Sequence, residues 1–301
     1  MWAALRLFFL LALFALPARS EQAWLLLSDN SAPYAEFEST LRDTLADSRW
    51  RLTVSHVAGS ADAPRPQADL IIAAGAQALR TVLAQNPSQP VLATLLPRQS
   101  FERLSAEFAG KLPRRLSAIW LDQPLVRQAS FLRHLLPDHR RIGVLLSPET
   151  RNQQTALQRA LSTANLSLDI EETDGERSLM PALGTLLPKV QVLLALPDTA
   201  IYRRDNIKPI LMTTYRHQRP LVAFSAAFVS AGALAALYST PAQIARQTAD
   251  ILQQPGSALP PPGSPTLFSI SLNSTVAQSL DLKLSDEASL RRALLSEREP
   301  K

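Results

Sequence analysis

The stretch that decides the fold is residues 68–79, which read ADLIIAAGAQAL. It holds a short apolar run at 69–74, one glycine at position 75 and the start of a helical pattern at Ala76. A continuous apolar strand that turns through glycine into an amphipathic helix is typical of a parallel sheet covered by helices on both faces. The segment is therefore expected to be one βα unit of an α/β fold.

The same order recurs on both sides of this unit. Further apolar runs predict strands at residues 23–28, 51–57, 90–96 and 116–121, and then at 142–147, 166–172, 190–196, 221–225 and 266–272. Amphipathic helical patterns fill the intervals between them. Because the element order restarts once near residues 122–124, the sequence predicts two similar lobes, although no sequence repeat is visible.

Residues 1–20, MWAALRLFFLLALFALPARS, have the features of a cleaved signal peptide. Arg6 precedes an apolar run of about ten residues, which is too short to span a bilayer, and Ala18 and Ser20 form a small-x-small cleavage site. An uncleaved membrane anchor is the alternative. No cysteine follows the run and no Arg-Arg pair precedes it, so the pattern fits neither a lipoprotein nor twin-arginine export. We therefore expect the mature chain in the periplasm.

Composition argues against several classes of protein. The chain has no cysteine, which excludes a disulfide framework and thiolate chemistry. Its formal net charge is only +5, and the basic residues are scattered along the sequence. They are not interleaved with aromatic residues as in a nucleic-acid groove, so we expect no nucleic-acid partner.

No catalytic or cofactor motif is present in the sequence. The nucleophile elbow, the P-loop, the H-E-x-x-H zinc motif and the dinucleotide fingerprint are all missing. The four histidines are dispersed, and without cysteine a zinc site would need a histidine–carboxylate cluster. We therefore expect a binding protein without cofactor or metal. An enzyme whose site is assembled only in space stays as an alternative.

Candidate ligand contacts follow from the order of the strands. In an open parallel sheet, ligands bind beyond the carboxyl ends of the strands, where helices begin. If two such lobes face each other, the loops after their strands line one cleft. The residues expected to contact a ligand are Ser28, Asn30, Ser31, Tyr34, Gly75, Ala76, Gln77, Ser147, Thr150, Asp198, Thr199, Ser225 and Tyr238.

The chemistry of these residues suits an amino-acid-like zwitterion. Hydroxyls and helix N-terminal amides suit a carboxylate, and Asp198 or Asp29 would take an ammonium group. Tyr34, Phe228 and Tyr238 would pack against an apolar or aromatic body. Each Ser, Thr or Asp also has a structural interpretation, because these residues are good helix N-caps after a strand.

Residues 221–254, LVAFSAAFVSAGALAALYSTPAQIARQTADILQQ, resemble the ABC-transporter substrate-binding protein family. Residues 68–79, 190–207 and 268–282 resemble the same family in a strand–glycine–helix turn, a strand that ends in Pro-Asp and a strand that ends in Leu-Asn. The resemblance implies two Rossmann-like parallel-sheet lobes joined by a hinge, the periplasmic binding protein type I fold. It also implies relatives associated with tryptophan and other aromatic amino acids.

The resemblance carries over to positions, domains and partners. The family's cleft positions fall on Gly75, Ala76, Asp198 and Ser225, with Tyr238 in the following crossover. The implied lobes are 21–121 with 235–255 and 122–225 with 266–301, and the implied crossover segments are 226–234 and 256–265. The chain is then expected to be a monomer that binds a small ligand between the lobes and delivers it to an inner-membrane ABC permease. The alternative is a periplasmic sensory or accessory protein of the same fold, acting on a membrane receptor or kinase.

Overall fold

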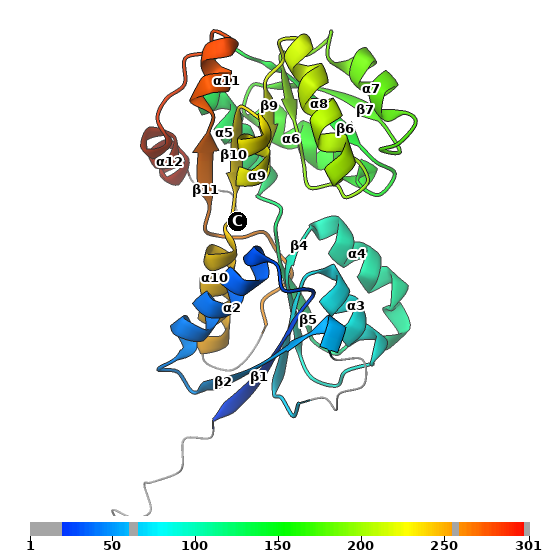
Figure 1. Cartoon of the computed structure of the whole chain (residues 1–301), viewed down its shortest axis with the longest axis vertical. Helices are drawn as coiled ribbons and strands as arrows, with labels where there is room; N and C mark the ends of the chain where they lie inside the picture. Colours follow the sequence, from blue (N-terminus) through cyan, green and yellow to red (C-terminus); the bar gives the residue numbers. More distant parts are fainter. Residues whose placement is uncertain (1–19, 60–65, 255–258, 298–301) are drawn as a thin grey trace, which may run out of the picture.

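The computed structural model describes residues 20–59, 66–254 and 259–297. They form two α/β lobes, one above the other in Figure 1, joined near the middle of the molecule. The expected two-lobed α/β architecture is therefore confirmed. The predicted signal peptide lies outside the described residues except for Ser20. Within the described ranges, no helix combines the length and apolar character needed to cross a membrane.

In the described residues, the first lobe is built on a five-stranded parallel sheet in the order β2-β1-β3-β4-β5. Its elements are β1 (Glu21–Leu27), α2 (Ala32–Leu45), β2 (Trp50–His56), β3 (Leu70–Ala74), α3 (Ala76–Ala84), β4 (Val91–Leu96), α4 (Arg98–Glu107), β5 (Leu116–Trp120) and α10 (Pro241–Gln253). Helices α2 and α10 cover one face of the sheet, and α3 and α4 cover the other.

The second lobe has a sheet in the order β11-β10-β9-β8-β6-β7, parallel except for the antiparallel pair β10 and β11. Its elements are α5 (Leu125–Leu135), β6 (Arg141–Leu146), α6 (Gln154–Thr163), β7 (Ser167–Glu172), α7 (Leu179–Leu186), β8 (Val192–Leu194), α8 (Arg204–Arg216), β9 (Leu221–Ala223), α9 (Ala226–Ala231), β10 (Ala235–Tyr238), β11 (Ser269–Leu272), α11 (Ser274–Ser279) and α12 (Glu287–Ser296). Apart from β11, which runs antiparallel, both sheets keep the parallel arrangement that the apolar runs predict.

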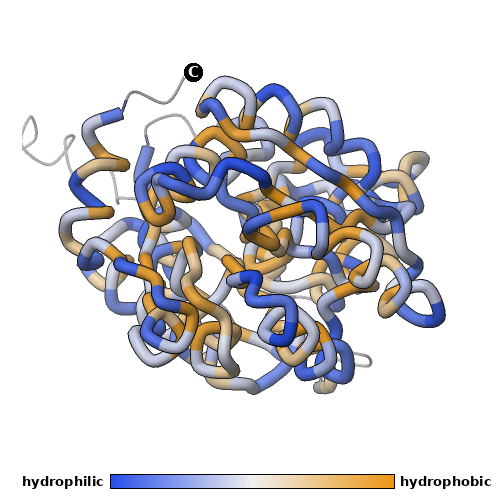
Figure 2. Tube along the Cα trace, turned by 90° about the horizontal axis from the view of Figure 1, so that it is seen from above, coloured by the Kyte–Doolittle hydropathy of each residue, from blue (hydrophilic) through white to orange (hydrophobic). Residues whose placement is uncertain are grey.

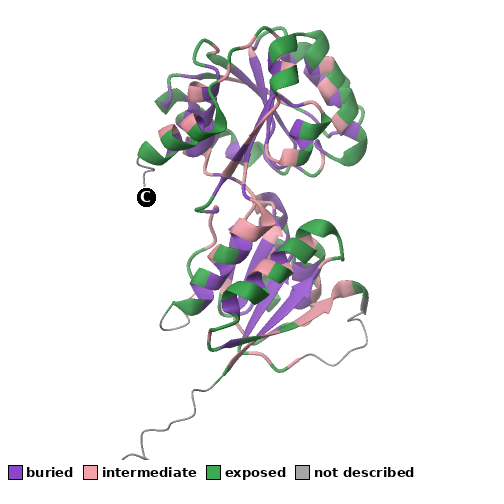
Figure 3. Ribbon diagram, turned by 60° about the vertical axis from the view of Figure 1, so that its left-hand side comes forward, coloured by how far each residue is buried: buried purple, intermediate pink, exposed green. Residues whose placement is uncertain are grey.

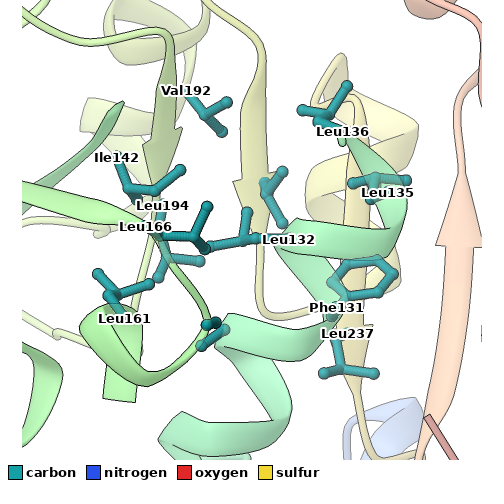
Figure 4. Close-up of a cluster of buried hydrophobic side chains, with 14 of the residues drawn as sticks. Phe131, Leu132, Leu135, Leu136, Ile142, Leu161, Leu166, Val192, Leu194 and Leu237 are labelled. Carbon is teal, nitrogen blue, oxygen red and sulfur yellow. The ribbon is translucent and has the colours of Figure 1, made fainter. Parts of the chain in front are cut away.

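The central strands of both sheets are buried on two faces, which is why they read as continuous apolar runs rather than alternating ones. Figure 3 shows them buried between helices whose outer faces are exposed, and in Figure 2 the hydrophobic segments run mostly through the interior. In the second lobe, Leu132 of α5 points toward Leu166 and toward Leu194 of β8 (Figure 4), and Leu135 belongs to the same buried cluster.

One part of the expected division between lobes is wrong. Residues 235–238, expected in the first lobe, form β10, which pairs with β9 and β11 in the second sheet. Residues 226–234, expected to cross between the lobes, hold α9 and the turn into β10. The strand was hidden because residues 226–237 are an almost unbroken run of small and apolar residues, with Gly232 (φ 122°) as the turn. Helix α10 does return to the first lobe beside α2, as expected.

The described chain passes between the lobes at residues 121–124, 239–240 and 264–268. A chain of hydrogen bonds joins all three passages. Gln123 Nε2 donates to Ser239 Oγ (2.8 Å), and Ser239 Oγ donates to the carbonyl oxygen of Leu267. The Gln123 and Ser239 side chains are buried. We call Gln123, Ser239, Leu267 and Arg127 the hinge group.

Arg127 of α5 ties the first and third passages together. Its Nη1 donates to Gln123 Oε1 (2.8 Å) and to the carbonyl oxygen of Pro265 (3.1 Å). Its guanidinium lies 4.8 Å from the centre of the Phe268 ring, within the range of a cation–π contact. Because Arg127 is only 7% exposed, these partners stabilise its charge in place of water. The hinge group is therefore a connected buried polar network.

Leu132→Ala is expected to lower the free energy of unfolding by about 2–5 kcal/mol, because it leaves a cavity in the core of the second lobe. The matched control is Leu295→Ala on α12 of the same lobe, where the side chain is 62% exposed, and a change of about 0.5 kcal/mol or less is expected. Urea denaturation followed by circular dichroism measures both. Equal losses in the two variants would contradict this packing.

Candidate functional site

A cleft of about 500 Å³ lies between the lobes, at the carboxyl ends of the strands. The first lobe contributes Tyr34 and Leu95, and the second lobe contributes Phe224, Ser225 and Tyr238. Its volume is that of a typical small-molecule site. The expectation that the ends of the strands in both lobes line one cleft is met in this part of the molecule.

The walls of the cleft are mostly apolar. Besides the aromatic rings, they include four prolines, namely Pro33, Pro97, Pro197 and Pro241. Pro33 and Pro241 lie in the first turns of α2 and α10, where a backbone N–H would otherwise point out of the helix. Since proline has no N–H, these helix starts offer few donors to the cleft. The geometry therefore favours an apolar ligand surface over an anion at these two helices.

Phe224 is held in the wall by other aromatic rings. Its ring centre lies 5.7 Å from that of Tyr202 and 4.9 Å from that of Phe228. Burial raises the pKa of the Tyr202 hydroxyl far above its ordinary value, and the negative charge of Asp198 raises it further. Phe228, expected to touch a ligand, is itself buried and supports Phe224 from behind. The ring that lines the cleft is thus pre-positioned.

A few polar groups accompany the apolar walls. Glu36 of α2 lines the cleft, and its Oε1 accepts a hydrogen bond from the N–H of Ala242 (3.3 Å) at the start of α10. Ser225 occupies the N-cap position of α9, but its side chain makes no capping hydrogen bond. Ser239 lines the cleft and belongs to the hinge group. The cleft and the hinge therefore share a residue.

Gly75 supports the position of Tyr34 rather than lining the cleft itself. Its φ is +92°, and a Cβ at this position would come within 2.3 Å of Tyr34 Oη and 2.4 Å of Ser28 Oγ. Ser28 Oγ donates to the carbonyl oxygen of Ala74 (2.9 Å) and accepts from the N–H of Ala78 (3.0 Å). Burial raises the pKa of the Tyr34 hydroxyl, while its hydrogen bond with Ser28 acts in the opposite direction. Glycine is required here by both the backbone and the close approach.

Asp198, Ser147 and Thr150 form a buried network of their own in the second lobe. Asp198 Oδ2 accepts from Thr150 Oγ1 (2.7 Å) and from the N–H of Ser147 (3.3 Å). Its Oδ1 accepts from the N–H groups of Ala200 (2.9 Å) and Ile201 (3.1 Å). Both carboxylate oxygens are therefore engaged within the protein, which gives Asp198 a structural role at this strand end.

Five further predicted contacts lie outside the lining of the cleft. Asn30, Ser31, Gln77 and Thr199 are exposed and Ala76 is half-buried, and none of them lines the cleft. Ser31 is the N-cap residue of α2 without a side-chain capping bond. Of the predicted set, the structure brings Tyr34, Ser225 and Tyr238 together around one cavity.

Sequence reasoning missed Glu36, Leu95, Leu121 and Phe224 as lining residues. Phe224 had a usable signal, because it directly precedes the predicted contact Ser225 at the end of a strand. Glu36 carried no comparable signal, because a carboxylate in an amphipathic helix usually marks the solvated face. In the described ranges, no group of three or more His, Asp or Glu side chains gathers as a metal site requires.

A smaller cavity of about 100 Å³ also lies between the lobes, lined by Arg98, Trp120, Asp122 and Gln128 among others. Leu121 lines the larger cleft, so successive residues of the first passage face the two cavities. Asp122 Oδ2 accepts from the N–H of Arg98 (2.7 Å) at the start of α4. Burial raises the pKa of Asp122 from 3.8 to about 6, although the bond from Arg98 lowers it in part.

Gly75→Ala is expected to lower the free energy of unfolding by about 2 kcal/mol or more, because a methyl group would be strained at this φ and would displace Tyr34. The control is Gly184→Ala in α7, where a Cβ would meet open space and a gain of about 0.5–1 kcal/mol is expected. Thermal unfolding compares the two. A gain in both variants would contradict the role given to Gly75.

Asp122→Asn is expected to change stability in a pH-dependent way. The folded-state pKa of Asp122 lies above its unfolded value, so the parent loses stability as the pH rises from about 4 to about 6. The variant lacks this titration, and its stability relative to the parent should rise by up to about 3 kcal/mol between about pH 4 and pH 7. Urea denaturation across this range measures the difference. A constant difference would contradict the burial of this carboxyl group.

Comparison with known proteins agrees with this geometry. The family model of ABC transporter substrate binding proteins matches residues 66–293, which is well over half of the chain. None of the curated proteins matches the sequence.

Three of the solved structures with a similar fold illustrate the likeness. A Streptococcus pneumoniae ABC domain in complex with L-Trp has a TM-score of 0.61 at 14% identity, covering 91% of this chain and 98% of that one. A conserved domain protein of Vibrio cholerae gives 0.61 at 16%, with 91% and 98% covered. A ligand-free, open substrate-binding protein with adhesive properties from Clostridium difficile gives 0.64 at 13%, with 88% and 96% covered.

At these identities the structures show the shared fold alone, which is the two-lobed fold with parallel sheets of periplasmic binding protein type I. The family match adds the class of function, which is substrate binding for transport and not catalysis. The chain belongs to the family of ABC transporter substrate-binding proteins.

Proposed function

We propose that this protein is the periplasmic receptor of an ABC transporter whose ligand is an amino acid or a similar compound with an apolar or aromatic side chain. One observation carries the proposal, namely an apolar cleft of about 500 Å³ whose aromatic walls come from both lobes. The walls are Tyr34 on one side and Phe224 and Tyr238 on the other. A ligand held between them would contact both lobes at once.

Burial of an apolar side chain would supply most of the binding free energy. An aromatic side chain buries roughly 150–250 Å², and at about 25 cal/mol per Å² this gives about 4–6 kcal/mol before the cost of association. Few polar groups of the cleft could supply as much. Their role in such sites is to fix the orientation of the ligand.

The polar end of the ligand has partners in the cleft. We assign an ammonium group to the carboxylate of Glu36 and a carboxylate oxygen to the hydroxyl of Ser225, which is not used as a helix cap. Asp198 or Asp29 was the predicted partner of the ammonium group. The two oxygens of Asp198 already accept four hydrogen bonds, and Asp29, which accepts from the N–H of Ser31, does not line the cleft. A charge-assisted hydrogen bond to Glu36 is stronger than one between neutral groups.

Two side chains of α4 contact Glu149 of the second lobe, and we call these contacts the rim contact. Gln99 Nε2 of α4 donates to Glu149 Oε2 of the second lobe, and Arg103 Nε lies 3.8 Å from the same oxygen. Because Arg103 and Glu149 are well exposed, such a pair contributes at most about 1 kcal/mol. The rim contact therefore favours the closed form only weakly. The equilibrium between the open and closed forms would be set by the difference in their affinities for the ligand.

The proposal is tested by thermal shift of residues 21–301 against a panel of amino acids, sugars and purines. At about 100 times its dissociation constant a ligand adds about 2.7 kcal/mol of stability, and we expect this from apolar or aromatic amino acids. Ser225→Ala should weaken the response, and Ser230→Ala, an exposed serine on the same helix, should not. A shift with sugars or purines alone would overturn the assignment of the ligand.

The permease partner is tested by uptake of the ligand into cells in which the chain has been deleted and then restored. Restored uptake supports a transport receptor. Uptake that does not depend on the chain, with ligand binding intact, would favour a sensory or accessory role instead. Fractionation of cells that express the full chain tests the periplasmic location and the cleavage after Ser20.

Glu149→Ala is expected to open the cleft in the absence of ligand, because it removes the contacts with Gln99 and Arg103. The population ratio of the open form to the closed form should rise by no more than about fivefold, because exposed ion pairs are weak. The control is Glu172→Ala, which removes an exposed ion pair with Arg151 (3.0 Å) inside the second lobe. Small-angle scattering should show a larger radius of gyration for the first variant only. Identical curves would show that the rim contact has no part in closure.

A further inference from the structure

Strand β4 departs from regular alternation just before it reaches the cleft. Leu92 packs on the side of α2 and α10, and Ala93 packs on the side of α3 and α4. Leu96, three residues after Ala93, packs on the same side as Ala93, whereas Leu95 packs on the side of α2 and α10. In a regular strand, residues three apart point to opposite faces. One extra residue must therefore lie between Ala93 and Leu96.

The pairing with β5 locates this extra residue. Thr94 pairs with Ile119 and Leu96 pairs with Trp120, so two steps along β4 correspond to one step along β5. Strand β4 stays paired with both neighbours next to the extra residue. The Thr94 carbonyl accepts from the N–H of Gly75 (2.7 Å), just after β3, and the Leu96 carbonyl accepts from the N–H of Leu121 (3.0 Å), just after β5. Leu95 is the bulged residue.

The backbone of Leu95 is strained by the bulge. Its φ is +53°, in the left-handed region that bulky side chains rarely adopt. The other non-glycine residues with positive φ in the described ranges are polar, and each is the second residue after the end of a helix: Asn86, Asn165, Gln218 and Asp281. Among the described residues, Leu95 alone combines this conformation with an apolar side chain inside a strand. Strain of this kind persists where the surroundings impose it, and it concentrates at functional sites.

The bulge turns the Leu95 side chain toward the face of the sheet that carries Tyr34, and Leu95 lines the cleft there. Without the bulge, regular alternation would place Leu95 on the side of α3 and α4 and Leu96 in its place. We propose that Leu95 is a specificity-determining residue, whose strained position supplies an apolar contact that selects ligands with an apolar or aromatic side chain over polar ligands of similar size. This inference rests on the proposed function.

Leu95→Asn tests the proposal directly. Asparagine adopts the left-handed region readily and is close to leucine in size, so the variant keeps the bulge and places an amide in the cleft. We expect the affinity for leucine, phenylalanine and tryptophan to fall about tenfold or more relative to that for glutamine. Isothermal titration calorimetry measures these ratios. The matched control is Gln218→Asn, which places the same residue at the same φ of 53° on the surface after α8.

Leu95→Gly separates the contact from the strain. Glycine relieves the strain and removes the side chain. The variant should therefore unfold at a temperature equal to or above that of Leu96→Ala, which loses a leucine side chain without any relief of strain. Its affinity for apolar amino acids should nevertheless fall. Because glycine suits this backbone conformation, the variant remains informative if Leu95→Asn does not fold.

The outcomes separate this proposal from the proposed function. If the parent binds an apolar amino acid and both Leu95 variants bind the panel with unchanged affinities and rank order, the selective role of Leu95 is overturned while the receptor function stands. If the parent binds no amino acid, the proposed ligand class fails, and the role of Leu95 fails with it. Loss of apolar ligands in the Leu95 variants, with Gln218→Asn unchanged, supports the proposal.

Discussion

The hydroxyl of Ser239 accepts a hydrogen bond from Gln123 and donates one to the carbonyl of Leu267, and it thereby joins the three passages between the lobes. Because the walls of the cleft come from both lobes, this buried contact fixes which residues face each other. Ser239 also lines the cleft. A buried group left without its partner costs about 1–3 kcal/mol, so the lobes are expected to rotate about the hinge group without breaking it.

Within this frame, residues behind the cleft hold its lining side chains in position. Gly75 makes room for the Tyr34 hydroxyl, Tyr202 and Phe228 hold the ring of Phe224, and the Asp198 network stabilises the neighbouring strand ends. Most of the rigid support is thus one layer behind the surface that a ligand would touch. Preorganised walls lose little side-chain entropy on binding, which favours affinity.

Much of the fold could be predicted from the sequence, since strands buried on both faces leave unbroken apolar runs such as 69–74, observed as Leu70–Ala74. Strand β10 was not predicted, because its small apolar residues continue those of α9 without a polar residue between them. Ser225 followed from the rule about strand ends, whereas Tyr34 and Tyr238 were chosen as aromatic side chains that would pack against an apolar ligand. The structural role of Asp198 could not be predicted, because the sequence cannot show that neighbouring donors occupy a carboxylate. The bulge at Leu95 depends on pairing with a distant strand, and no glycine marks it.

The central claim is that an apolar ligand side chain lies between the two lobes in the cleft of Tyr34, Leu95, Phe224 and Tyr238. The most direct measurement is a crystal structure of residues 21–301 grown with the amino acid that stabilises the chain most. The ligand side chain is expected between these residues, with its polar end near Glu36 and Ser225. A ligand found in the smaller cavity beside Asp122, or on the outer surface of either lobe, would contradict the claim.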